Sequence, residues 1–292
     1  SLRRYVTQKD IPSWGLGRIS SREPGSDKYV YHQSAGEDTC SYIVDTGIYP
    51  DHPEFEGRAE QIKNYASNAT SDDNGHGTHV AGTIGSKSYG VAKKTKLLGI
   101  KVLNQYGSGT WSDVIAGIGY AVTDSATRDC PNGAVINMSL GGERSQAIND
   151  AVAAAVDAGV FVAVSAGNDG LNSDAFSPAS EPKAFTVGAT DRNDNITSFS
   201  NYGFLVDSFA PGLDINSTWI GGPDAFEVIS GTSMASPHVA GLASYLLGIH
   251  GPLKPADLAS KIKVLSTKNK VKNIFPNTGT PNFLAYNGRP LF

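Results

Sequence analysis

The chain has 292 residues, of which 39% are hydrophobic and 18% charged, as is ordinary for a soluble globular protein. Its formal net charge of −4 argues against nucleic acid or an anionic membrane as a partner. No apolar run is long enough to span a bilayer, and no Pro/Ser-rich linker divides the chain. We therefore expect a single domain over residues 1–292. We also expect this domain to be a monomer.

Strand and helix patterns alternate along most of the chain. Residues 1–20 show no regular pattern, and the first clear element is a buried strand, Tyr42-Ile43-Val44, that ends at Asp45. A glycine-punctuated loop then enters an apolar helix near His76. Further strands are expected at 96–103, 135–138, 160–164, 184–187 and 204–209. Further helices are expected at 111–128 (capped by Ser112), 145–158, after Ser233, and at about 255–265.

This alternation indicates βαβ units. It predicts an α/β fold with a doubly wound, mostly parallel central sheet and helices on both faces. Sites in such sheets lie at the carboxyl ends of the strands. Asp45, Ser139 and Asn168 each follow a strand. His76 and Ser233 each begin a helix that faces the same rim, so we expect all five residues to converge on one edge.

Ser233 stands at a loop-to-helix junction, before a run of small and apolar residues. The first N–H groups of a helix have no partner within it, and the helix dipole favours negative charge there. That position suits a nucleophile whose attack on a carbonyl generates an oxyanion. Considered alone, Ser233 is better interpreted as an N-cap.

The other groups that a hydrolytic site needs are also present, and they favour a nucleophile over an N-cap at Ser233. A serine nucleophile needs an imidazole base, and the base needs a carboxylate to orient it. Asp45, His76 and Ser233 supply these parts, and Asn168 with the Ser233 N–H can bind the oxyanion. The order acid, His, Ser and the absence of Gly-x-Ser-x-Gly exclude an α/β-hydrolase. A zinc protease would need His-Glu-x-x-His, but the segment from His76 to His79 lacks both the glutamate and the spacing. A dinucleotide-binding protein would need Gly-x-Gly-x-x-Gly after the first strand, and none follows Val44.

The chain has two cysteines, Cys40 and Cys130. Their separation excludes a CxxC redox motif and a cysteine metal site. They either pair or remain as separate buried thiols, and the residues alone do not decide between these alternatives.

Three segments resemble the signature blocks of the subtilisin-like serine proteases: Asp45-Thr46-Gly47, residues 76–83 (HGTHVAGT) and residues 231–238 (GTSMASPH). Other segments are similar to the proteinase K branch, which includes secreted fungal cuticle-degrading proteases. These segments are residues 14–16 (WGL), 52–55 (HPEF), 107–109 (GSG), 139–142 (SLGG), 177–180 (SPAS) and 198–203 (SFSNYG). The resemblance covers nearly the whole chain.

The resemblance implies a secreted serine endopeptidase that works through an acyl-enzyme on Ser233. It makes His76 the base, Asp45 its orienting acid and Asn168 the oxyanion donor. His79, one helical turn beyond His76, competes for the role of base, and the resemblance gives it a packing role instead. A catalytically dead subtilase that acts as a scaffold is the remaining alternative. The presence of every chemical part argues against it.

The resemblance also implies a substrate cleft with two backbone edges that pair with an extended peptide. Small, uncharged walls imply broad specificity with a preference for apolar or aromatic residues before the cut. The implied cleft residues are Gly107, Ser108 and Gly109 on one edge, Ser139, Leu140 and Gly141 on the other, Trp111 in an upstream pocket, and Ala166 and Gly167 in the pocket wall.

The resemblance also implies bound calcium and a disulfide. A strong structural Ca²⁺ site is implied at the carbonyls of Pro182 and Ala184 and the carboxylate of Asp207. Arg22 stands where the branch places part of a weaker site. A Cys40–Cys130 disulfide is also implied.

The implied partners are protein and peptide substrates, the enzyme's own inhibitory prosegment and proteinaceous inhibitors. Residues 1–292 are then the mature form. Sequons at Asn68, Asn195 and Asn216 favour an extracellular glycoprotein.

Overall fold

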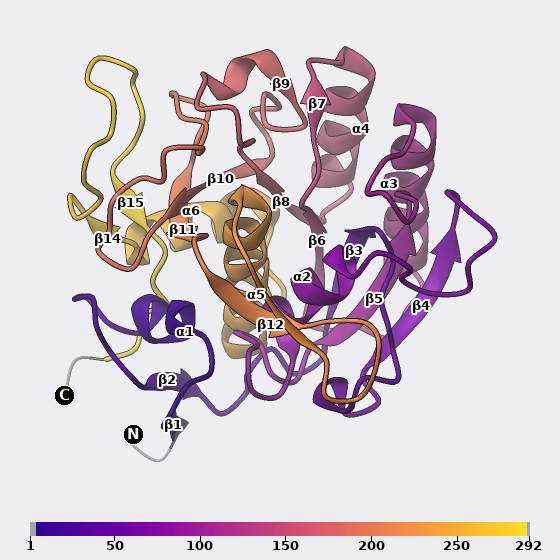
Figure 1. The fold of residues 1–292 in the computed structure, drawn as a ribbon, viewed down its shortest axis with the longest axis horizontal. Helices are drawn as coiled ribbons and strands as arrows, with labels where there is room; N and C mark the ends of the chain where they lie inside the picture. The colour runs from indigo at the N-terminus through magenta and orange to yellow at the C-terminus, as the bar shows by residue number, and fades with distance from the viewer. Residues whose placement is uncertain (1–3, 291–292) are drawn as a thin grey trace.

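The computed structural model describes residues 4–290. Its centre is a nine-stranded sheet with the order β14-β15-β11-β10-β8-β6-β3-β5-β4, parallel except for the β14–β15 pair (Figure 1). The strands are β3 (Thr39–Asp45), β4 (Ala59–Asn64), β5 (Lys96–Lys101), β6 (Gly133–Met138), β8 (Phe161–Ser165), β10 (Phe185–Thr190), β11 (Ser208–Pro211), β14 (Thr267–Lys268) and β15 (Phe283–Leu284).

Helices and three small sheets surround this sheet in the described part of the chain. The helices are α1 (Trp14–Ile19), α2 (His76–Gly85), α3 (Trp111–Ser125), α4 (Gln146–Asp157), α5 (Thr232–His250) and α6 (Pro255–Leu265), with short 3₁₀ turns at Pro53–Phe55 and Ser173–Ala175. The small antiparallel sheets pair β1 (Tyr5–Gln8) with β2 (Tyr29–His32), β7 (Gly142–Glu143) with β9 (Phe176–Ser177), and β12 (Ile215–Thr218) with β13 (Phe226–Ile229).

The alternation of side chains along β3 explains why helices cover both faces of the sheet. Ile43 packs into a core with residues of α2, α5 and α6, whereas Tyr42 and Val44 pack against α3 and α4 on the other face. Figure 1 shows α5 near the middle of the molecule and α3 and α4 side by side. Because both faces are buried, the strand is a continuous apolar run. The predicted doubly wound α/β fold is confirmed.

Several predictions about individual elements were wrong. Residues 1–20 are not irregular, because they contain β1, which pairs with the distant β2, and α1, whose Leu16 is buried in the core. Thr110, not Ser112, caps α3: its Oγ1 accepts a hydrogen bond from the Asp113 N–H at 3.1 Å. The strand predicted at 204–209 begins only at Ser208, since Phe204 lies 64% exposed in a loop.

Sequence analysis also missed β4, the edge strand of the sheet. Its residues, Ala59–Asn64, are mostly polar and carry no apolar alternation, because a strand at an edge buries little of its surface. Only the pairing with β5 defines it.

Cys40 and Cys130 form a disulfide across a Cα–Cα distance of 5.7 Å, which confirms the expected pairing. The bond ties the start of β3 to the turn that follows α3. Among residues 4–290, none of the helices combines the length and apolar character that crossing a membrane requires.

Candidate active site

Asp45 and His76 meet at the carboxyl end of the sheet. Asp45 is the last residue of β3 and is fully buried, and His76 is the first residue of α2. His76 Nδ1 lies 2.7 Å from Asp45 Oδ1, and the Thr46 N–H donates to the same oxygen at 2.7 Å. Burial alone lowers the pKa of His76. The charge and hydrogen bond of Asp45, with the charge of Asp72, outweigh burial and raise this pKa above its ordinary value.

Asp72 organises the loop that leads into α2, and sequence analysis missed it. Its Oδ1 accepts from Thr46 Oγ1 at 2.8 Å and from the N–H groups of Asn74 at 3.0 Å and Gly75 at 2.9 Å. Its Oδ2 accepts from the N–H and Oγ1 of Thr78 at 2.9 and 2.6 Å. The available signal was an aspartate just before a helix start, where a carboxylate satisfies unpaired N–H groups.

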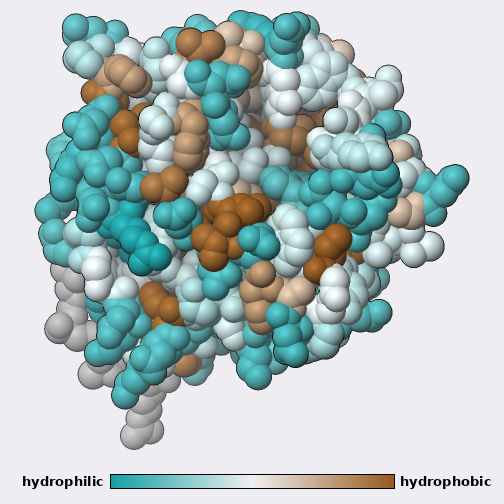
Figure 2. Space-filling view, viewed as in Figure 1, coloured by the Kyte–Doolittle hydropathy of each residue, from teal (hydrophilic) through white to brown (hydrophobic). Residues whose placement is uncertain are grey.

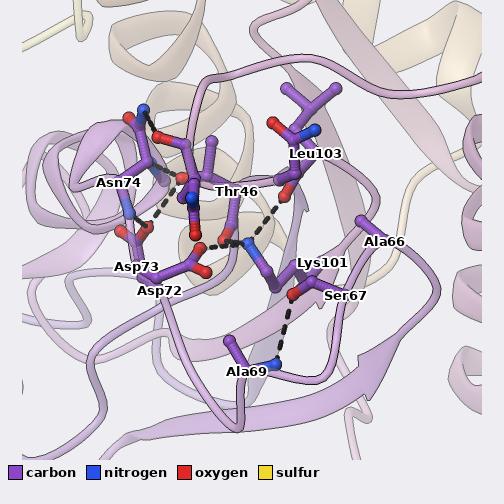
Figure 3. Close-up of polar contacts among 12 residues, drawn as sticks. Thr46, Ala66, Ser67, Ala69, Asp72, Asp73, Asn74, Lys101 and Leu103 are labelled. Atoms are coloured by element: carbon purple, nitrogen blue, oxygen red, sulfur yellow. Dashed lines mark hydrogen bonds and ion pairs between the residues drawn. The ribbon is translucent and has the colours of Figure 1, made fainter.

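Lys101, at the end of β5, is a second organising residue that sequence analysis did not identify (Figure 3). Its ammonium is buried and donates to the carbonyls of Thr46 at 2.7 Å and Leu103 at 2.6 Å, and to Asp73 Oδ1 at 2.6 Å. A buried ammonium needs such a complete set of acceptors. Lys101 thus joins the residue after Asp45, the segment that follows β5 at Leu103 and the loop before His76.

Ser233 lies in the first turn of α5, as expected. Its Oγ donates to the Ser139 carbonyl at 3.3 Å, and the described residues show no hydrogen bond between Ser233 and His76. Asn168 follows β8, and its Oδ1 accepts from the N–H and Oγ1 of Thr232, both at 2.8 Å. Neither of these bonds uses Asn168 Nδ2, so this donor remains available beside Ser233.

Two neighbouring pockets contain all the sequence-predicted cleft residues, and they share the wall formed by residues 140–143. The first is lined by His76, Gly107, Ser108, Gly109, Trp111, Ser139, Leu140 and Gly141, among others. The second is lined by Leu140, Gly141, Ala166, Gly167, Asn168 and Ser233, among others. Gly142 is part of this shared wall, and a Cβ on it would lie 2.8 Å from the Trp111 ring, so only glycine fits there without displacing the ring.

Comparison with known proteins identifies the family. A family model for the subtilase family, peptidase S8, matches residues 42–280. The chain belongs to the subtilase family. This subtilase is 55% identical over 283 residues to the "Cuticle-degrading protease" of Metarhizium anisopliae, covering 97% of this chain and 72% of that protein. It is 52% identical over 280 residues to "Proteinase R" of Parengyodontium album, covering 96% and 70% of the two chains.

A solved structure agrees with this assignment. The crystal structure of a cold adapted subtilisin-like serine proteinase matches with a TM-score of 0.86 and 41% identity, over 95% of this chain and 98% of that one. The resemblance to the proteinase K branch is confirmed, and the chain is a serine endopeptidase of the subtilisin type.

The other histidine of α2 has a different environment in this subtilase. His79 is fully buried, and its Nε2 contacts the carbonyl oxygens of Ile215 at 3.0 Å and Glu227 at 3.1 Å. Burial lowers the pKa of His79 to about 3. With its ring nitrogen held between two backbone carbonyls, His79 joins α2 to β12 and β13, as expected for a packing role.

The residues expected to bind calcium do not fit the ion as they stand. Pro182, Ala184 and Asp207 do border one pocket. Asp207 Oδ1, however, lies 2.6 Å from Lys263 Nζ, and its Oδ2 accepts the Thr186 N–H at 2.8 Å. One carboxylate oxygen is therefore already bound by a cation.

Arg22 is a second fixed cation, at the position where the resemblance implies a weaker calcium site. Its guanidinium lies 3.7 Å from the centre of the Tyr286 ring and donates to the Leu265 carbonyl at 2.8 Å and to Thr267 Oγ1 at 3.0 Å. A guanidinium in that position repels a divalent cation.

Proposed function

We propose that this subtilase is a secreted endopeptidase that cleaves peptide bonds through an acyl-enzyme on Ser233. The observation that carries the proposal is the 2.7 Å contact between His76 Nδ1 and buried Asp45 Oδ1 at a rim that also holds Ser233 and Asn168. This contact holds one imidazole nitrogen as a donor, so the other nitrogen is free to accept a proton.

The proposed reaction begins when the Ser233 side chain rotates from the Ser139 carbonyl toward His76 Nε2. His76 takes the hydroxyl proton as Ser233 Oγ bonds to the substrate carbonyl carbon, and Asp45 stabilises the imidazolium. The imidazolium then protonates the leaving amine as the C–N bond breaks, which leaves an ester on Ser233. Water activated by His76 hydrolyses this ester in the same way.

The charge that develops on the carbonyl oxygen is proposed to be bound by Asn168 Nδ2 and the Ser233 N–H. Thr232 holds Asn168 through its Oδ1, which orients the amide and leaves Nδ2 free to donate. The Ser233 N–H belongs to the first turn of α5 and has no partner within the helix. Donors fixed before the reaction begins need no reorganisation in the transition state.

The substrate is proposed to lie as an added strand between residues 107–109 and 139–141. Broad specificity with an apolar or aromatic residue before the cut is supported by the small walls at Ala166 and Gly167. The same pocket also carries two carboxylates, Glu143 and Asp169, which sequence analysis did not include.

These two carboxylates predict that an acidic residue before the cut is disfavoured. We expect kcat/KM for a nitroanilide peptide ending in Glu to be roughly tenfold or more below that of the matched Gln peptide, because like charges repel. Glu143→Gln should narrow the difference, and added salt should do the same. Equal rates for the Glu and Gln peptides would contradict this assignment of the pocket.

Extracellular location and a monomeric state are part of the proposal. The Cys40–Cys130 disulfide suits an oxidising compartment. Among the three sequons expected to be exposed, Asn68 is exposed, whereas Asn195 and Asn216 are half-buried, so Asn68 is the best-placed acceptor for a glycan. The face in Figure 2 is mostly hydrophilic with small, separate hydrophobic patches, which supports a monomer. The enzyme's own prosegment and proteinaceous inhibitors are the proposed partners besides substrates.

Intact mass after treatment with a serine-directed sulfonyl fluoride tests the proposal. One adduct on the wild type and none on Ser233→Ala, with activity lost in step with labelling, supports an activated Ser233. Folded wild-type protein that takes up no adduct would favour the catalytically dead scaffold instead.

The charge of Asp72 leads to a pH prediction. His76 must be neutral to accept a proton, so kcat/KM should rise as pH rises through the pKa of His76. Asp72 helps to raise that pKa. Asp72→Asn should therefore lower the pKa of His76 and move the acidic limb of the kcat/KM profile to lower pH.

Asp73→Asn is the matched control for this change. It removes a neighbouring carboxylate that pairs with Lys101 and is not among the causes of the His76 pKa shift. An acidic limb that stays in place in Asp72→Asn, or moves equally in both variants, would show that the Asp72 charge does not act on His76.

A further inference from the structure

Asp207 immediately precedes β11 and borders a pocket that is lined by α6, by the end of α4 and by the starts of β8 and β10. Its backbone N–H donates to the Thr186 carbonyl at 2.8 Å, and its Oδ2 accepts the Thr186 N–H at 2.8 Å. These bonds fix the carboxylate, whose side chain is only 17% exposed. A carboxylate with so little access to water requires a cation or further donors to remain charged.

Lys263 supplies that cation. Its Nζ lies 2.6 Å from Asp207 Oδ1 and 5.8 Å from the centre of the Phe185 ring. The lysine is carried by α6, which is held in place by buried Leu258 and Ile262. The ammonium therefore reaches Asp207 from a rigid element.

The charges around the pocket disfavour a divalent ion. Three lysines, Lys183, Lys254 and Lys263, and two aspartates, Asp157 and Asp207, border it. Calcium needs six to eight oxygen ligands, and Lys263 Nζ already binds one of the Asp207 oxygens. A calcium ion at that oxygen would also meet the positive charge of the ammonium.

We propose that Lys263 is a built-in counter-ion that takes the place of calcium at Asp207, so that this part of the fold is stabilised without a bound ion. Lys263 joins α6 to β11 much as an ion shared by neighbouring segments would. The carbonyls of Pro182 and Ala184 then bind water instead of a metal. The proposal concerns stability and does not depend on the catalytic roles assigned above.

Thermal unfolding of sulfonyl fluoride-inhibited protein, in EDTA and in millimolar calcium, tests the proposal. Lys263→Met should lower Tm in EDTA by up to about 2–4 °C, because the Lys263 side chain is 40% exposed and such a pair is worth at most about 1 kcal/mol. Added calcium should raise the Tm of Lys263→Met back to the wild-type value. It should not raise the Tm of the double variant Lys263→Met/Asp207→Asn. Calorimetric titration with calcium should show one more site in Lys263→Met than in the wild type.

Lys183→Met is the matched control. Lys183 borders the same pocket but pairs with the exposed Asp157 at 2.7 Å, so its loss should leave the calcium response unchanged. Added calcium should change the Tm of the wild type and of Asp207→Asn by the same amount, because any calcium that stabilises either protein would bind at a site other than Asp207.

Two results would overturn the proposal. One is a calcium response or calorimetric site in the wild type that Asp207→Asn abolishes, which would show that calcium binds despite Lys263. The other is folded Lys263→Met that gains neither a calcium response nor a site. The first comparison does not need Lys263→Met to fold.

Discussion

Replacing Ser233 by alanine is expected to lower kcat for peptide hydrolysis by about 10⁶, a magnitude that comes from subtilisin, the prototype of the family, and not from the present geometry. The physical reason is that no other group can form the acyl intermediate. His76 keeps its 2.7 Å contact with Asp45 but has no hydroxyl proton to accept. The measurement is the initial rate on suc-Ala-Ala-Pro-Phe-nitroanilide and on casein, with KM expected to change little.

Ser230→Ala is the control for this variant. Ser230 is exposed near the start of α5, and its Oγ accepts a hydrogen bond from the Asp214 N–H at 2.8 Å, away from the pocket residues. Its activity should equal that of the wild type. If folded Ser233→Ala keeps more than about one hundredth of the wild-type rate, Ser233 is not the nucleophile.

Asn168→Ala is expected to lower kcat by about 10²–10³ and to leave KM nearly unchanged, again a magnitude known from the matching asparagine of subtilisin. The amide acts on the charge that develops on the carbonyl oxygen, so its loss is felt in the transition state and hardly in substrate binding. Steady-state kinetics with the same nitroanilide separate kcat from KM.

Thr232→Val tests whether the orientation of Asn168 matters. It removes the 2.8 Å bond from Thr232 Oγ1 to Asn168 Oδ1 and the 3.2 Å bond that Oγ1 accepts from the Gly167 N–H, but it keeps the bond from the Thr232 N–H to Asn168. Each such bond is worth about 1 kcal/mol, so kcat should fall roughly fivefold if only the bond to Asn168 matters and roughly 30-fold if both do, less than in Asn168→Ala. An Asn168→Ala effect confined to KM would place the amide in substrate binding instead of oxyanion stabilisation.

The catalytic assignments depend mainly on the order and spacing of residues along the chain. Asp45 ends a continuous apolar strand, and His76 and Ser233 begin helices, so the local pattern already places all three at one rim of a parallel sheet. The cleft segments 107–109 and 139–141 follow from the same pattern combined with the family resemblance. Sequence was sufficient to place these residues at one edge of the sheet because the signals are local: apolar periodicity, glycine and strand ends.

The choice between His76 and His79 was less clear from sequence. Both lie on α2, and periodicity treats them alike. The structure separates them because β12 and β13, more than a hundred residues away along the chain, place two carbonyls on His79, whereas Asp45 meets His76. The family resemblance had indicated the same choice.

The sequence by itself therefore determined the α/β class and the positions of Asp45, His76, Ser233 and Asn168 along the sheet edge. Only the tertiary structure decided which polar side chains support them: Asp72 against Thr46, Lys101 against three separate segments, and Lys263 against Asp207. The physical reason is that a buried charge is stable only with partners, and these partners come from distant parts of the chain. The sequence shows where each lysine and aspartate lies along the chain, but it does not show which distant residue the fold places beside it.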